Sequence, residues 1–181
     1  SFPRVSAYFG PPDADNQAQR VDQPTPGGFY RMSLGPDDRG CERFQDFYQD
    51  NGSRQSNEVT TCDPDDLTRW DGQGFEGLIL GYRPTGQLRT RQTLYLGVPH
   101  GRDHYYDDRG RERISVSWQH GQVHGAFRFK DINGRVRVEG VAHESEVRQI
   151  RAWKNGRKLS RTQALALYNQ ARQGWYADMF R

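Results

Sequence analysis

The stretch YYDDRGRERISVSWQHGQVHG, residues 105–125, decides the fold of this chain, because its pattern is repeated on either side. Residues 81–101 precede it with an aromatic residue, a polar turn ending in glycine, an alternating segment and a closing His-Gly. Residues 127–143 follow it as a third copy, which lacks the closing His-Gly. The first glycines of the three copies stand at positions 86, 110 and 134, which are 24 residues apart. A fixed period of this length indicates a repeat array.

Each copy has the features of a β-hairpin. In RISVSW, residues 113–118, polar and apolar residues alternate, which places them on opposite faces of a strand. Gly110 can adopt the positive φ that a tight turn needs, and the Asn-Gly pairs at 133–134 and 155–156 are strong hairpin signals. We therefore predict an all-β fold, an array of stacked antiparallel β-hairpin repeats of about 24 residues, with a C-terminal capping helix.

The period also assigns structural roles to the aromatic residues and the glycines. Because a single hairpin buries too little surface to be stable, stacked hairpins must share an apolar seam. The predicted seam consists of Tyr82, Leu88, Leu94, Leu96, Tyr106, Ile114, Val116, Trp118, Phe127, Phe129, Val136, Val138 and Trp153. The predicted turn glycines of the repeats are Gly52, Gly86, Gly110, Gly134, Gly156, Gly101 and Gly125.

The order of an aromatic pair, a polar turn with glycine, an alternating strand and Gly-x-x-His-Gly resembles the MORN-variant repeat of bacterial proteins. Five segments carry the resemblance: residues 46–53, 81–101, 105–125, 127–143 and 153–159. Many proteins with such repeats are described as antitoxin-like or immunity-like. The resemblance therefore implies an interaction scaffold without fixed catalytic residues. Two features depart from the pattern, the insertion around Cys62 and the missing His-Gly of the third copy.

The composition of the 181 residues fits a thin array better than a compact globule. Hydrophobic residues make up 33% of the chain and the mean hydropathy is −1.03, whereas the 12% aromatic content argues against disorder. The 26 basic and 23 acidic residues give a net charge of +3 and are interspersed, so the charge alone does not indicate nucleic-acid binding. No apolar run reaches the roughly 20 residues of a transmembrane helix.

The two cysteines, Cys41 and Cys62, bear on the cellular compartment. They do not form a Cys-x-x-Cys motif, so neither a metal site nor a redox pair is indicated. In a reducing cytosol they would be free thiols, whereas in an oxidising compartment they would form a disulfide worth about 3 kcal/mol. We predict the disulfide and, from it, a periplasmic or otherwise exported bacterial protein. A start at Ser1 without a visible signal peptide is expected of a processed chain.

The pattern divides the chain into four segments. Residues 1–28 are rich in Pro, Asp, Gln and Gly and are predicted to form an extended N-terminal arm, with a flexible leader as an equal alternative. Residues 29–77 are predicted to hold one or more divergent first repeats, with an insertion fixed by the disulfide. Residues 78–159 are the repeat array, and residues 160–181 form the C-terminal helix and tail.

The C-terminal segment begins with a helix signal. Ser160 and Gln163 have the spacing of a capping box, and an apolar face at helical spacing follows up to residue 172. Gly174 is predicted to follow the last residue of the helix. Because repeat arrays need caps, we expect this helix, with its aromatic tail from Trp175 onward, to cover the open edge of the last hairpin. Binding of a partner is the alternative role.

Candidate catalytic and metal-binding residues have simpler explanations. The histidine pairs 100/104 and 120/124 have the spacing of helical metal ligands, but they lie in predicted hairpins. Residues 63–66 with Asp71 offer carboxylates without the order of a calcium loop. Nucleophile and phosphate-loop motifs are not present in the sequence. We therefore predict no metal, no cofactor and no enzymatic activity.

The function classes that remain are binding functions. Tyr, Trp and Arg are the usual hot-spot residues of protein interfaces. Together with the resemblance and the predicted export, they indicate an immunity or antitoxin-like protein that sterically neutralises a secreted toxin. The alternative is an anionic lipid surface that binds a stripe of arginines after the turns, while nucleic acid is disfavoured by export. The candidate binding residues are Arg89, Arg91, Arg111, Arg113, Arg135, Arg137, Tyr105 and Trp175.

Overall fold

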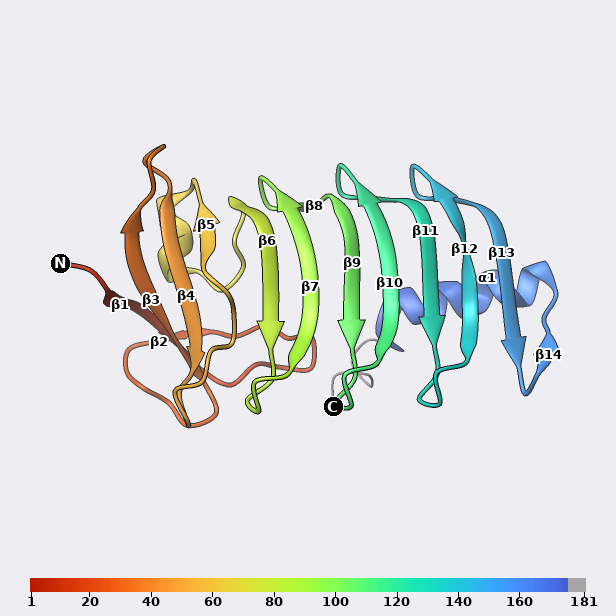
Figure 1. Ribbon diagram of the computed structural model, residues 1–181, viewed down its shortest axis with the longest axis horizontal. Coiled ribbons are helices and arrows are strands. Elements are labelled where there is room, and N and C mark those ends of the chain that lie inside the picture. Colours follow the sequence, from red (N-terminus) through yellow and green to blue (C-terminus); the bar gives the residue numbers. More distant parts are fainter. Residues whose placement is uncertain (176–181) are drawn as a thin grey trace. The chain divides into compact units, whose positions relative to one another are not determined.

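The computed structural model describes residues 1–175 and the side chains of residues 1–173. The chain forms two compact units, residues 1–98 and residues 99–181, and each is described by itself. Both units are sheets of antiparallel hairpins, which confirms the predicted all-β class (Figure 1). The limit between the units falls 21 residues after the predicted start of the array at residue 78, because β6 and β7 belong to the first unit.

The first unit is a sheet of seven strands in the order β7-β6-β5-β4-β3-β1-β2. Residues 1–28, predicted as an extended arm, contain two of these strands, and Phe9 of β1 pairs with Phe29 of β3. The strands are β1 Arg4–Phe9, β2 Arg20–Val21, β3 Phe29–Pro36, β4 Glu42–Tyr48, β5 Val59–Thr61, β6 Phe75–Tyr82 and β7 Leu88–Tyr95. A further short strand, β8, is Val98–Pro99, at the limit of the two units.

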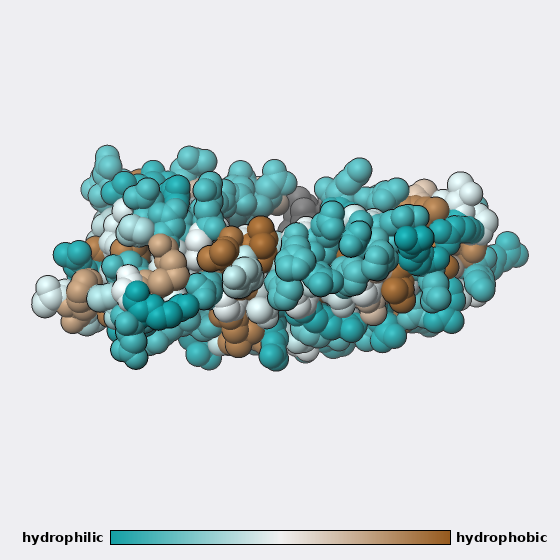
Figure 2. All heavy atoms as spheres, turned by 90° about the horizontal axis from the view of Figure 1, so that it is seen from above, coloured by the Kyte–Doolittle hydropathy of each residue, from teal (hydrophilic) through white to brown (hydrophobic). Residues whose placement is uncertain are grey.

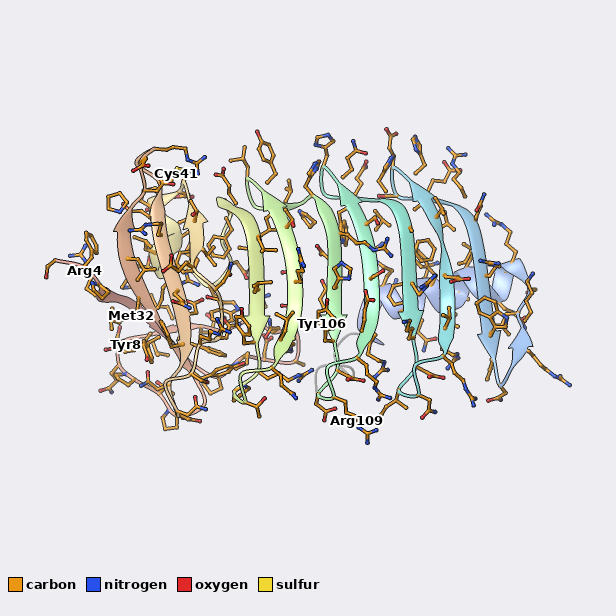
Figure 3. All side chains as sticks on the ribbon, viewed as in Figure 1. Arg4, Tyr8, Met32, Cys41, Tyr106 and Arg109 are labelled. Carbon is orange, nitrogen blue, oxygen red and sulfur yellow. A yellow bond between two sulfur atoms is a disulfide. The ribbon has the colours of Figure 1, made fainter. Side chains whose placement is uncertain are left out.

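The insertion between β5 and β6 covers one face of this sheet. It contains a 3₁₀ helix, η1 Pro64–Thr68, followed by Trp70, whose ring lies 5.3 Å from that of Phe9 and 4.8 Å from that of Phe29. Cys41, labelled in Figure 3, forms a disulfide with Cys62 at the start of the insertion. The predicted disulfide is therefore confirmed, and the insertion supplies apolar cover that the flat hairpins lack.

A buried arginine joins the sheet to the insertion. Arg31 of β3 is only 1% exposed and donates from Nε and Nη2 to the two carboxylate oxygens of Asp46, at 2.8 and 2.9 Å. Its Nη1 donates to the backbone carbonyls of Asp66 and Arg69 in the insertion. The guanidinium also lies 4.1 Å from the ring centre of Phe44. Because every direction around the charge is occupied by an acceptor or a ring, this cation can be buried.

The second unit is a sheet of six strands in the order β14-β13-β12-β11-β10-β9. Each strand follows its neighbour in the sequence, so the sheet is a simple succession of hairpins. The strands are β9 Gly101–Tyr106, β10 Glu112–Gln119, β11 Gln122–Lys130, β12 Val136–His143, β13 Glu146–Lys154 and β14 Arg157–Lys158. The helix α1, Arg161–Gln170, follows and is extended by a wide helical turn, η2 Ala171–Trp175.

The helix covers a face of the second sheet and not its last edge, which corrects the predicted position of the cap. Ala164, Tyr168 and Ala171 are buried in one cluster with the apolar residues of β10, β11 and β12. The ring of Tyr168 lies 4.5 Å from that of Phe127. The apolar residues on one face of a sheet need a second layer to bury them. The helix α1 provides this layer, and Figure 1 shows it behind β10–β13.

The ends of α1 agree only partly with the sequence. The capping box is formed as predicted, because Ser160 Oγ accepts from the Gln163 amide while the Gln163 side chain accepts from the Ser160 amide. Gly174 does not end the helix, because it lies within η2. Of the predicted aromatic tail, residues 176–181 lie outside the described residues.

Polar turns repeat with the same hydrogen bonds, as the period predicted. Oδ1 of Asp107 accepts from the amides of Arg109 and Arg111, both at 3.0 Å. Oδ1 of Asp131 and Oδ1 of Asp37 in the first unit likewise accept from the backbone amides two and four residues later in the sequence. The glycines of these loops have positive φ, as have the predicted turn glycines Gly52, Gly86, Gly110, Gly134 and Gly156.

Gly101 and Gly125 are strand residues and not turn residues, which corrects the prediction for this pair. Gly125 has φ 107° within β11, where the register with β10 shifts, and a Cβ there would lie 3.0 Å from Ser117. Gly101 begins β9 with φ 109°. The turn between β10 and β11 is His120-Gly121 instead. Both glycines thus have a positive φ within or at the start of a strand, and at Gly125 this coincides with a bulge.

Candidate functional site

The second unit has one covered and one open face, and the open face is the candidate binding surface. Ile114, Val116 and Phe127 point towards α1 and are 1% exposed. Their neighbours along the strands point the other way, and Arg128 among them is exposed. Figure 1 looks onto this open side of the strands, with α1 behind them.

A row of polar side chains crosses the open face at one level of the sheet. His104 pairs with Ser115, Ser115 with Arg128, Arg128 with Glu139, and Glu139 with Arg151. The row therefore takes one residue from each of β9 to β13. Because paired residues of neighbouring antiparallel strands stand about 5 Å apart on the same face, these side chains are in reach of one another.

The centre of the row is a carboxylate held by two arginines. Arg128 Nε lies 3.2 Å from Glu139 Oε2, and Arg151 Nη2 lies 2.7 Å from Glu139 Oε1. The two arginine side chains are 50% and 62% exposed, whereas that of Glu139 is 17% exposed. The glutamate thus lies at the base of the row, and the arginines reach from it towards solvent.

A hollow of about 650 Å³ lies over this row. Five arginines and one glutamate provide its charged lining, while Ala126 and Val141 contribute apolar surface. The charged residues are Arg102, Arg128, Arg148, Arg151, Arg161 and Glu139. Since the whole chain carries a net charge of only +3, this hollow concentrates positive charge on one surface. Such a surface attracts anionic groups and raises the rate at which an anionic partner associates.

The other arginines of the hollow are oriented by contacts with residues that do not include Glu139. Arg102 donates from Nε and Nη2 to Ser115 Oγ, at 3.2 and 2.6 Å. Arg161, the first residue of α1, donates to the carbonyl of Val147. Arg148 lies 3.4 Å from Glu146, whose side chain is 69% exposed. Arg102 and Arg161 are therefore oriented by uncharged acceptors, whereas Arg148 is paired with a carboxylate.

Of the six arginines predicted as one basic stripe, three in the second unit have structural partners within their own hairpins. Arg113 and Arg137 stand 24 residues apart at bulges, where Nε of each donates to a carbonyl of the following strand, Lys130 at 3.0 Å and Trp153 at 2.8 Å. Arg111 pairs with Asp107. These arginines stabilise turns and hairpins, which explains their recurrence without a ligand.

The other predicted arginines are not lining residues of the hollow. Arg89 and Arg91 belong to β7 of the first unit, and burial lowers the pKa of Arg89, with Tyr48 opposing and Arg83 adding to that shift. Arg135 is exposed and borders, with Arg137, a second hollow of about 620 Å³ near Trp153. The sequence thus predicted that exposed arginines on a sheet would form the binding surface, but it did not identify which arginines line the hollow.

Of the two aromatic candidates, Tyr105 alone has a described side chain. Tyr105 pairs with Ile114 and packs against the core cluster on the covered side. Trp175 is the last residue of η2, and its side chain lies outside the described part of the structure.

The histidines have the structural role that their recurrence suggested. His100 Nδ1 accepts from the amide of His120, and His124 Nδ1 accepts from the amide of Glu144. Each bond joins a histidine near a strand end to a turn that lies 20 residues further along the chain. Figure 2 looks onto these strand ends, where hydrophilic residues prevail. Among residues 1–173, no group of three or more His, Cys, Asp or Glu side chains could hold a metal ion.

The acidic residues of the insertion and of the repeat turn at Asp107 interact with the chain itself. Asp63 and Asp66 both pair with Arg69, at 2.7 and 2.8 Å. Burial would raise the pKa of Asp107, but the amides of Arg111 and Arg109 and the guanidinium of Arg111 outweigh burial and lower it. A carboxylate kept ionised by turn amides is a structural group and a poor proton acceptor.

Comparison with known proteins gives no family: no protein-family model and no curated protein matches this chain. In the part of the chain that the structure describes, no helix is long and apolar enough to cross a membrane. Functional inference therefore rests on the geometry of the open face.

The arginines of the hollow were missed because their spacing is not that of the repeat. Positions 102, 128 and 151 are separated by 26 and 23 residues, so a search at 24 residues does not align them. The signal that could have found them is alternation within strands, as in Phe127-Arg128-Phe129-Lys130, combined with strand pairing. That combination requires the bulges to be known, since each bulge shifts the register by one residue.

Proposed function

We propose that this protein is a non-enzymatic, exported scaffold that binds a protein partner through the open face of its second unit. The observation that carries the proposal is the asymmetry of that sheet, with one face sealed by α1 and the other lined by exposed arginines over a hollow of about 650 Å³. Arginine is enriched at protein interfaces because its planar guanidinium forms several directed hydrogen bonds and its stem packs on apolar groups.

The partner class follows from the compartment and the resemblance. A disulfide between Cys41 and Cys62 supports an oxidising compartment such as the bacterial periplasm. The MORN-variant resemblance of the repeats supports an immunity or antitoxin-like role. In that role the open face would cover the active site of a secreted toxin, so that inhibition is steric and needs no catalytic group in this chain.

An anionic lipid surface is the second candidate function. The observation in its favour is the same excess of arginine over acid in the hollow. A protein partner is favoured because the arginines stand around a recessed carboxylate and not on a convex surface with protruding apolar groups.

The test is recovery of a partner on the immobilised, oxidised protein. The protein is incubated with secreted proteins of its source at physiological ionic strength, and retained proteins are identified by mass spectrometry. The site variant is Arg128→Glu with Arg151→Glu. The matched control is Arg109→Glu with Arg135→Glu, two exposed arginines outside the arginine-lined hollow, and Figure 3 shows Arg109 pointing away from the sheet.

We expect one protein in stoichiometric amount with the wild type and the control, and its loss with the site variant. An interfacial charge pair turned into a like-charge contact costs several kcal/mol, which removes micromolar binding. Retention of lipid without protein would support the lipid function, and equal recovery by all three proteins would contradict use of the open face.

A further inference from the structure

We propose that the hollow recognises an acidic segment of the partner, whose carboxylate takes a place equivalent to that of Glu139 between two guanidinium groups. This inference rests on the proposed function and gives the partner its chemistry. The bound segment would be a short loop or terminus rich in Asp and Glu, and it would lie across β9 to β13 on the open face.

Glu139 shows what the hollow can hold. Its two oxygens are divided between Arg128 and Arg151, at 3.2 and 2.7 Å, so guanidinium groups on alternate strands are spaced to hold one carboxylate between them. Charge-assisted hydrogen bonds of this type are about twice as strong as neutral ones. The chain thus contains an internal example of the contact that a partner would make.

The remaining arginines provide sites for further carboxylates. Arg102 is oriented by the neutral Ser115 Oγ, and Arg161 by the backbone carbonyl of Val147. Neither acceptor carries a charge that would compensate the guanidinium. Glu139 and Glu146 pair with three of the five arginines. Arg102 and Arg161 are therefore left for acidic groups of a ligand.

The size and lining of the hollow fit a peptide better than a single ion. Its volume of about 650 Å³ lies within the range of about 300–1,000 Å³ for ligand pockets. Val141 is 40% exposed and offers apolar contact between the charges, together with Ala126. A peptide with acidic and small apolar residues matches both features.

The test uses a short fluorescein-labelled peptide rich in Asp and Glu, and the same peptide with amides in place of the acids. Fluorescence anisotropy is measured with the full chain at physiological ionic strength, where charges are screened beyond about 8 Å. We expect binding of the acidic peptide only. Arg128→Ala and, in parallel, Arg151→Ala should weaken it by about tenfold, because a cation is lost and Glu139 is less neutralised.

Glu139→Gln is the decisive variant. Removal of this carboxylate relieves competition for Arg128 and Arg151, so we expect the acidic peptide to bind about threefold more tightly. If Glu139→Gln damaged the sheet, binding would become weaker instead. The direction of the change therefore distinguishes relief of competition from structural damage. Arg109→Ala, which removes the same charge from an exposed turn, should leave the affinity unchanged.

Several results would overturn the inference. They are equal binding of the acidic and amide peptides, weaker binding by Glu139→Gln, and an equal effect of Arg109→Ala and Arg128→Ala. Binding of phosphatidylglycerol vesicles but not of the peptide would assign the hollow to lipid. Recovery of a partner that Arg128→Ala leaves unchanged would refute this inference alone, whereas peptide binding without any recovered partner would refute only the proposed function.

Discussion

At the scale of single residues, the position of an arginine on a strand decides its role. Arg113 at a bulge is 8% exposed and donates to a backbone carbonyl, so it stabilises a hairpin. Arg128, on the neighbouring strand but at a regular position, is exposed and faces the hollow. Arg31 in the first unit is buried and joins two layers. The same residue type thus serves three purposes that composition cannot separate.

Gly110 tests whether the turns of the repeat depend on glycine. Its φ is 79°, and a Cβ there would meet no atom within 4 Å, so a side chain causes backbone strain and no clash. Gly110→Val should lower the free energy of unfolding by about 2 kcal/mol in urea titration. Gly110→Asn is the control, because Asn tolerates this conformation, and it should cost less than half as much. Equal losses for the two variants would contradict the role of the turn.

Asp66 should make the stability of the first unit sensitive to acid. Burial would raise its pKa, but hydrogen bonds from Thr61, Arg69, Gly74 and Gln73 outweigh burial and lower the pKa below 3.8. A lowered pKa in the folded state contributes stability above the unfolded pKa, and this is lost as the pH falls through the folded value.

The unfolding free energy of the wild type should therefore decrease, as the pH falls below the unfolded pKa of about 4, more steeply than that of Asp66→Asn. Urea titrations at several pH values measure the two slopes. Asp65→Asn, an exposed carboxyl of η1, is the control and should keep the wild-type slope. Identical slopes for Asp66→Asn and the wild type would show that Asp66 is not the responsible group.

At the scale of elements, each sheet is completed by a segment that is not a hairpin. The insertion with η1 and Trp70 covers the first sheet, and α1 covers the second. Both segments interrupt or follow the repeat in the sequence. In the described part of the chain, one face of the second sheet is therefore sealed by α1 and the other face is open.

Tyr168 is the residue through which α1 contributes most to the core. It is 5% exposed and its ring contacts those of Phe127 and Phe129. Tyr168→Ala should lower the free energy of unfolding by about 3 kcal/mol, because a large cavity opens between helix and sheet. Tyr168→Phe keeps the ring and loses only the contact with Arg172, so it should cost about 1 kcal/mol or less. A small, equal effect of both changes would mean that the helix does not seal this face.

The class of the fold could be predicted from the sequence because hairpins are local. The turns around Gly86, Gly110 and Gly134 are set by a few neighbouring residues, and period-two alternation assigns the strands. The segments that cover the sheets were harder to predict, because α1 contacts β12 and β13 through residues whose pairing does not follow from spacing in the sequence. The hollow was not predicted, because it depends on the register of five strands and on their bulges.

At the scale of the whole molecule, the disulfide links the fold to its compartment. It joins residues 21 positions apart and fixes the insertion to the turn after β3. Mass spectrometry should find the native protein about 2 Da lighter than the reduced protein, and reduction should lower the free energy of unfolding by about 3 kcal/mol. Free thiols in the protein isolated from its source would remove the main support for export.

The central claim is that the open face of the second unit contacts the partner, and arginine modification tests it most directly. The protein alone and in complex with its recovered partner is treated briefly with phenylglyoxal, and modified arginines are located by mass spectrometry. We expect the complex to protect Arg128 and Arg151, while Arg109 and Arg135 react as in the free protein. Unchanged reaction of Arg128 and Arg151 in a complex that protects other arginines would contradict it.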